Sequence, residues 1–302
     1  MSTLTVSLDQ RTASCRGDSG KLLILEPEIF RQRFNRSPFM IEHRLQDHPL
    51  LSLPSLVELS RRLQPESVKY NEGNLAVGDN LEKAPVNGLS IEETIRRIEQ
   101  QCSWMVLKNV QNDRDYRLLL EQCLEEIRPH SERLDPGMCD ARAFIFISSP
   151  NSVTPFHIDP EINFLLQIRG SKNMSVFDPF DRQILPEQAL ERFSVAENLG
   201  VVKYRNDLES RAFVAKLSPG TGVHVPVTAP HWVKNGPAVS ISFSITFRSP
   251  STEKRRKLYW MNAQLRRIGI RPAPIGSSRW RDELKHGVFC TLASAKKLVA
   301  KS

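Results

Sequence analysis

The sequence predicts a mainly β core with helical segments before and after it. Following Pro136-Gly137, short runs rich in β-branched and aromatic residues recur between Pro, Gly, Asn and Asp turn residues. Six such runs follow one another: ARAFIFIS, INFLLQIRG, KNMSVFDP, FVAKLSP, GVHVPV and VSISFSITF. Several short strands separated by turns are typical of a β sandwich or barrel. On both sides of this stretch, apolar residues recur at helical spacing instead.

The region before the core is predicted to be mainly helical. Residues 1–22 are polar and rich in Ser and Thr, which indicates a flexible tail. Residues 23–135 should pack on the core, with helices in SLPSLVELSRRL, SIEETIRRIEQQC and DRDYRLLLEQCLEEIRPH. Ser90 would cap the second helix with Glu93 completing a capping box, and Pro129 would end the third. SWMVLKNV, short and apolar, predicts one strand between the last two helices.

Residues 136–250 form the predicted β core, and its last strand indicates a cavity. VSISFSITF alternates large apolar side chains with Ser and Thr. Because alternate residues of a strand point to opposite faces, one face is apolar and should pack against helices. The other face carries small hydroxyl groups, which suits the wall of a ligand cavity inside a barrel.

The C-terminal region is basic and amphipathic. Residues 251–302 carry 13 Lys/Arg against 3 Asp/Glu, whereas residues 1–250 carry 29 against 31, so the excess positive charge lies at the end. An apolar stripe at helical spacing consists of Leu258, Met261, Leu265 and Ile268. It favours a helix that packs on the core or pairs two copies into a homodimer, with Arg255 and Arg256 on its solvent side. Recruitment of an acidic partner stays open, and nucleic-acid binding is not expected because no helix-turn-helix pattern is visible.

The composition excludes several classes of protein. A hydrophobic content of 40% and a charged content of 25% are ordinary for a soluble domain. No window approaches the roughly 18 consecutive apolar residues of a membrane span, and the first thirty residues lack a secretory signal pattern. The five cysteines are scattered and form no CxxC pair, which argues against zinc ribbons and thioredoxin chemistry. We therefore expect a cytoplasmic protein with reduced thiols and no membrane segment.

A candidate metal site begins in TPFHIDPEIN. His157 and Asp159 are two residues apart, and residues i and i+2 of a strand point to the same face. His231, in APHWVKN before the last core strand, is the candidate third ligand, with His224 as the alternative. Two imidazoles and one carboxylate form the facial triad that binds Fe(II) and leaves coordination positions open. The purely structural alternative is a hydrogen-bonded pair of His157 and Asp159.

These segments resemble the JmjC-type, cupin-fold 2-oxoglutarate oxygenases, most plainly their asparaginyl hydroxylases. The similarity runs from about Arg142 to Phe247. Its matching residues are Thr154, Pro155, His157, Asp159, Asn163, Phe164, Gln167, Ile168, Gly170, Lys172, Pro230 and His231. The resemblance implies a double-stranded β-helix of the cupin or jelly-roll type. It also implies that Fe(II) is bound by His157, Asp159 and His231.

The same resemblance assigns a cosubstrate pocket. In the family, a Thr three residues before the first His and a Lys fifteen residues after it bind the far carboxylate of 2-oxoglutarate. Thr154 and Lys172 occupy those positions. Asn163 matches a further pocket residue, and Ser244 stands where the family has an Asn on the strand after the distal His. A Lys172 ammonium inside a barrel is costly to bury alone, and a dicarboxylate would neutralise it.

The resemblance therefore implies an Fe(II)- and 2-oxoglutarate-dependent dioxygenase that uses O2 to hydroxylate an unactivated C–H bond. The expected substrate is an amino-acid side chain, free, carrier-bound or in a protein, or another small metabolite. The alternative is a catalytically silent cupin-like ligand sensor or transcriptional regulator with the same pocket. The complete set of metal and cosubstrate residues favours the enzyme.

Overall fold

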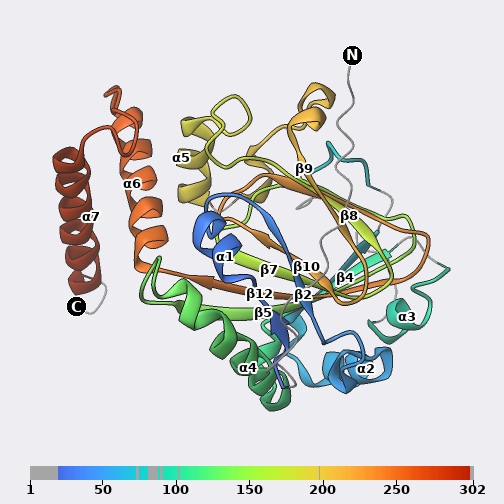
Figure 1. Ribbon diagram of the computed structural model, residues 1–302. Helices are drawn as coiled ribbons and strands as arrows, with labels where there is room; N and C mark the ends of the chain where they lie inside the picture. Colours follow the sequence, from blue (N-terminus) through green and yellow to red (C-terminus); the bar gives the residue numbers. More distant parts are fainter. Residues whose placement is uncertain are drawn as a thin grey trace.

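Two antiparallel sheets face each other in the computed structural model, which describes residues 20–72, 75–80, 88, 91–100, 103–196 and 198–299 (Figure 1). The larger sheet contains β1 (Leu23–Ile24), β2 (Phe39–His43), β3 (Val68–Glu72), β4 (Ser103–Lys108), β5 (Cys139–Ser148), β7 (Ile162–Arg169), β10 (Thr221–Val225) and β12 (Ser240–Arg248). The smaller sheet contains β6 (Val153–His157), β8 (Lys172–Val176), β9 (Phe213–Leu217) and β11 (His231–Asn235).

The strand orders are those of a double-stranded β-helix. The larger sheet runs β1-β2-β10-β7-β12-β5-β4-β3, and the smaller runs β6-β11-β8-β9. Consecutive core strands therefore alternate between the sheets at several places along the chain. The predicted fold class, a mainly β cupin core with helical extensions, is confirmed.

Seven α-helices surround the sheets in the described part of the chain. They are α1 (Pro27–Arg33), α2 (Leu53–Arg62), α3 (Ile91–Arg96), α4 (Arg114–Ser131), α5 (Glu187–Ala196), α6 (Pro250–Arg267) and α7 (Arg279–Val299). Short 3-10 turns lie at Pro49–Leu51, Pro65–Ser67, Val110–Asn112, Leu199–Val201 and Asn206–Arg211. The helix α5 and the two turns after it stand between β8 and β9, where the sequence pattern indicated only strands.

Alternation along β12 separates the core from the interior of the barrel, as predicted. Phe243 and its apolar neighbours point away from the smaller sheet and are buried in one cluster with residues of α1, α2 and α4. Figure 1 shows α2 and α4 on that outer side of the larger sheet. The Ser and Thr residues of β12 are also buried, but on the opposite face. The apolar face anchors the sheet, so the hydroxylated face is left to line the space between the sheets.

The N-terminal region contributes more strand than its helical pattern predicted. Besides the expected β4, it supplies β1, β2 and β3, which extend both edges of the larger sheet. Pro129 does not end α4, because the helix continues to Ser131. A proline removes only one hydrogen bond this close to the end, and the buried side chains of Ile127 and Ser131 hold the last turn in place. The predicted cap at Ser90 lies outside the described residues.

The C-terminal helices stand at one side of the sheets, with α6 against α5 and α7 outermost (Figure 1). Within the predicted stripe, Leu258 and Met261 are buried, whereas Ile268 is exposed because α6 ends one residue earlier. Arg255 and Arg256 are not free on the solvent side, which corrects the prediction: they are half-buried. Arg255 lies over the rings of Phe180 and Tyr259, and Arg256 pairs with Glu253. None of the described helices has the length and hydrophobicity to cross a membrane.

Candidate metal centre

The three predicted ligands meet at one end of the smaller sheet. His157 is the last residue of β6, His231 is the first residue of β11, and the two positions pair in register. Asp159 follows in the loop after β6. The Nε2 atom of His157 lies 3.7 Å from Asp159 Oδ1, and the Nε2 atom of His231 lies 3.5 Å from Asp159 Oδ2. The three candidate ligand atoms all fall within 4.8 Å of one another, which suits a single ion.

A β-bulge aims His157 at the site. His231 pairs with His157 but Val233 pairs with Thr154, so β6 spans three residues where β11 spans two. The extra residue falls around Pro155, which has no N–H to lose from the ladder. The bulge frees the Pro155 carbonyl, and His157 Nδ1 donates to it over 2.7 Å. This bond fixes the tautomer and leaves the Nε2 lone pair for a metal.

The ring of His231 is fixed in the same manner. Its Nδ1 donates to the carbonyl of Ala229 at 2.9 Å, so Nε2 again faces the site. Burial, and then the neighbouring His157, lower the pKa of His231 to about 4. The imidazole is therefore neutral at pH 7 and able to act as a ligand. A backbone bond from Thr228 N–H to the Asp159 carbonyl, at 2.9 Å, ties the loop of the carboxylate to the loop before His231.

His224 is not a third ligand. It lies on β10 in the larger sheet, with its ring on the helical side rather than in the space between the sheets. Its Nε2 accepts the Asn35 N–H at 2.9 Å, and it packs against Phe34, Phe39 and Phe164. The alternative to His231 is therefore excluded by position.

The triad opens into a cavity of ≈ 170 Å³ between the two sheets. All four predicted cosubstrate residues line it, two from the smaller sheet (β6 and β8) and two from the larger sheet (β7 and β12): Thr154, Lys172, Asn163 and Ser244. Its other walls are mainly apolar and aromatic, with Phe144, Phe146 and Val106 among them. This combination of an apolar wall and a few polar groups is typical of a small-molecule site.

Lys172 is the most unusual residue of this cavity. Its side chain is 5% exposed, and no ion pair or hydrogen bond of its ammonium is found among the described residues. Burial lowers its pKa to about 7. Gly170, with a φ of 69°, turns the chain from β7 into β8 and places Lys172 at the first position of the strand. A Cβ at Gly170 would lie 2.3 Å from the Val239 carbonyl oxygen, so only glycine fits this turn.

Asn163 and Ser244 act as one unit on the opposite wall. The Ser244 hydroxyl donates to the Asn163 side-chain oxygen at 2.8 Å, and both residues are buried. The bond leaves the amide NH2 of Asn163 as the group available to a ligand. Ser240 and Ser242, on the same face of β12, bond to Gln167 instead and close the wall behind them.

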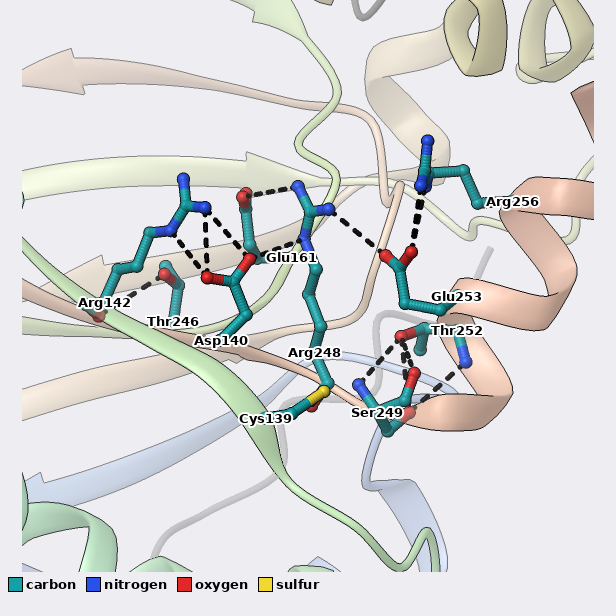
Figure 2. A network of polar contacts seen from close by, with 10 residues as sticks. All are labelled: Cys139, Asp140, Arg142, Glu161, Thr246, Arg248, Ser249, Thr252, Glu253 and Arg256. Atoms are coloured by element: carbon teal, nitrogen blue, oxygen red, sulfur yellow. Dashed lines mark hydrogen bonds and ion pairs between the residues drawn. The ribbon is translucent and has the colours of Figure 1, made fainter. Parts of the chain in front are cut away.

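A charged network adjoins the outer end of the cavity (Figure 2). Arg248 stands between three carboxylates: its guanidinium lies 3.1 Å from Glu161, 3.2 Å from Glu253 and 3.6 Å from Asp140. Glu161 both lines the cavity and is 9% exposed. Burial and the nearby Asp159 raise the pKa of Glu161, and Arg248 opposes that shift. Arg142 binds Asp140 from the far side, so the network alternates in charge.

Sequence reasoning missed the contribution of β4 to the cavity. Trp104, Val106 and Lys108 alternate along this strand and all line the space between the sheets. The indole N–H of Trp104 is buried and has no hydrogen-bond partner among the residues that the structure describes. The period-2 alternation of SWMVLKNV was the available signal, but nothing local indicated that this strand joins the core sheet beside β5.

The fold and the site together define a cupin-type barrel with a candidate metal site of two histidines and one carboxylate. The cupin-like domain family matches residues 30–253, and the chain belongs to this family. The resemblance drawn from the sequence is confirmed at this level.

Several solved structures of YcfD from Escherichia coli are similar to this chain. One has 16% identity and a TM-score of 0.49, and covers 85% of this chain and 62% of that one. A second, of the ribosomal oxygenase YcfD with cobalt and 2-oxoglutarate, has 15% identity and a TM-score of 0.49, over 85% and 61%. A third, with cobalt and succinic acid, has 16% identity and a TM-score of 0.45, over 90% and 67%. These similarities concern the fold, and the chain spans less than two thirds of the first two relatives.

Proposed function

We propose that this protein is an Fe(II)- and 2-oxoglutarate-dependent dioxygenase that hydroxylates an unactivated C–H bond. The observation that carries the proposal is the buried Lys172, whose ammonium has no partner among the described residues and which shares a cavity with the His157, Asp159 and His231 triad. A buried ammonium without a counter-ion is unfavourable, and an anionic ligand would relieve it. A dicarboxylate can serve the triad and Lys172 together, because one end can bind the metal while the other neutralises the lysine.

The donor set fits iron. Two imidazoles, each held by a backbone carbonyl through its Nδ1 atom, and one carboxylate match the facial triad of non-haem Fe(II) sites. Fe(II), 2-oxoglutarate and O2 together would supply the C–H hydroxylation, with succinate and CO2 as co-products. The chain's own part is to hold the ligands, neutralise the cosubstrate and keep water away from the reacting centre.

The strand register supports an orientation of 2-oxoglutarate in which one end lies at the triad and the other at Lys172. Along β8, Val176 pairs with His231, and Lys172 is four residues further along the same strand. Thr154 pairs with Val233, at the level between them. In this proposal the metal-binding end of 2-oxoglutarate lies by the triad, and Lys172 and Thr154 take its far carboxylate. Asn163 and Ser244 would line the pocket from the opposite wall.

The test is succinate formation from 2-oxoglutarate by Fe(II)-loaded protein offered fractionated cell extract. Stimulation by one fraction, lost in Asp159→Ala, would support the enzyme and lead to its substrate. Binding of Fe(II) and 2-oxoglutarate without any succinate in any fraction would instead favour the sensor or regulator. The substrate in this proposal is an amino-acid side chain or another small metabolite, and a cytoplasmic location remains an expectation.

A further inference from the structure

Two lysines share the cavity face of adjacent strands at its outer end. Lys108 is the last residue of β4, pairs with Phe144 of β5, and lines the cavity. Lys69 of β3 pairs with Val106, which also lines the cavity, so Lys69 and Lys108 lie on the same face. Diagonal neighbours on paired strands are within reach of long side chains, and the charge of Lys69 acts on Lys108.

Neither lysine has an acidic partner in the part of the chain that the structure describes. Among the residues that the structure describes, no carboxylate forms an ion pair with Lys69 or Lys108. Burial, and then the charge of Lys69, lower the pKa of the half-buried Lys108. Two close ammonium groups without a counter-ion repel each other, and an anion beside both would relieve the repulsion.

The nearest acids are already committed to other groups. Asp159 and Glu161 are the two carboxylates that act on Lys108 through space. Asp159 is a ligand of the metal centre, and Glu161 accepts from Arg248 at 3.1 Å (Figure 2). With both engaged, the outer end of the cavity keeps an excess of positive charge on β3 and β4.

We propose that Lys69 and Lys108 form an anion-binding site that takes a carboxylate or phosphate group of the substrate. The site lies at the end of the cavity away from Lys172, since Lys108 is level with Phe144 whereas Trp104 and Ser148 mark the other end. Phe144, Phe146 and Leu199 line the same cavity as Lys108 and the triad. The substrate is therefore an acid with an apolar body. This inference rests on the proposed function in treating the bound anion as the substrate.

The experiment compares three probes of matched shape: 3-phenylpropionate, phenyl phosphate and the neutral 3-phenylpropanamide. Their dissociation constants are measured by ligand-detected NMR on protein loaded with diamagnetic Zn(II) and saturated with 2-oxoglutarate, so that the Lys172 end is filled. We expect at least one anion to bind about tenfold or more tightly than the amide. Whichever anion binds tighter identifies the group that the site prefers.

Variants then locate the binding. Lys108→Met should weaken the affinity for the anion at least about fivefold and leave the affinity for the amide unchanged. Lys108→Arg keeps the positive charge and should keep the affinity for the anion. Lys216→Met is the matched control, because Lys216 is exposed on β9 of the smaller sheet. Equal affinities for anion and amide, or anion binding that survives both Lys108→Met and Lys69→Met, would overturn the proposal.

A paramagnetic measurement separates this inference from the proposed function. With Mn(II) bound at the triad, proton signals of the bound anion should broaden in wild-type protein. If Mn(II) and 2-oxoglutarate bind normally but Lys108→Met does not change the anion affinity, only the proposed anion site is contradicted. If Mn(II) does not bind while the Lys108-dependent anion affinity persists, the proposed enzyme is wrong and the anion site stands.

Discussion

His157 and His231 occupy paired positions on β6 and β11, and their ring centroids lie 4.2 Å apart. Their Nδ1 atoms donate to the Pro155 and Ala229 carbonyls, and both Nε2 atoms lie beside the Asp159 carboxylate. The ladder between two antiparallel strands thus holds together residues that are far apart in the chain.

The first prediction concerns the metal. His157→Ala, Asp159→Ala and His231→Ala should each abolish stoichiometric binding of Mn(II) or Fe(II), because each removes one of three protein ligands. Anaerobic calorimetric titration measures the stoichiometry. His224→Gln is the control and should bind the metal normally, since His224 lies on the other face of the larger sheet. The reverse result for His224 and His231 would disprove this assignment of the third ligand.

The second prediction concerns Lys172. Lys172→Met should weaken 2-oxoglutarate binding by roughly 30- to several-thousand-fold, because it removes a desolvated charge contact, and should leave metal binding intact. The same change should raise the free energy of unfolding of the ligand-free protein at pH 7 by about 1–4 kcal/mol, since a buried unpaired ammonium is removed. Urea denaturation measures this gain. Weaker cosubstrate binding together with a loss of stability would point to a structural role instead.

The third prediction concerns acid. Burial lowers the pKa of His224 to about 3. A histidine in the unfolded chain takes up its proton near pH 6.5, so between those two values the unfolded state binds more protons than the folded one. The stability contributed by the neutral, buried His224 is fully present above about pH 6.5. Below about pH 6.5 the free energy of unfolding falls by about 1.4 kcal/mol per pH unit.

His224→Gln tests this directly. Glutamine keeps an acceptor for the Asn35 N–H but has no proton to take up, so the slope of stability against pH between about 6.5 and 5 should fall by close to one proton. Urea unfolding at three pH values gives the slope. An unchanged slope would show that proton uptake by His224 on unfolding does not contribute to the loss of stability in acid.

The fourth prediction concerns the outer helix. Exposed apolar side chains recur along α7 at four-residue spacing: Trp280, Leu284, Val288 and Leu292. The predicted homodimer through the C-terminal helices would cover this face. Leu284→Glu should then lower the molar mass measured by light scattering, while Leu118→Glu, on the exposed side of α4, should not. A monomeric wild-type protein would rule out the dimer.

The strands of the core and the clustering of the three candidate metal ligands could be predicted because their signals are local. His157 and Asp159 stand two apart beside a strand, and the alternation of VSISFSITF showed which face meets the helices. By contrast, β1 to β3 are short and give no clear period, and their pairing with distant strands decides their conformation. Lys69, Lys108 and Glu161 became site residues only through register across sheets, which spacing in the sequence does not contain.

The central claim is that one cavity binds Fe(II) and 2-oxoglutarate together. Anaerobic titration of Fe(II)-loaded protein with 2-oxoglutarate, followed by visible absorption, tests it most directly, because chelation of Fe(II) by the keto acid produces a charge-transfer band. We predict a saturable band with one equivalent of 2-oxoglutarate. In Lys172→Met the same band should require much higher concentrations, and in His231→Ala it should be absent. A wild-type protein that binds Fe(II) but develops no band at any concentration of 2-oxoglutarate would contradict the account.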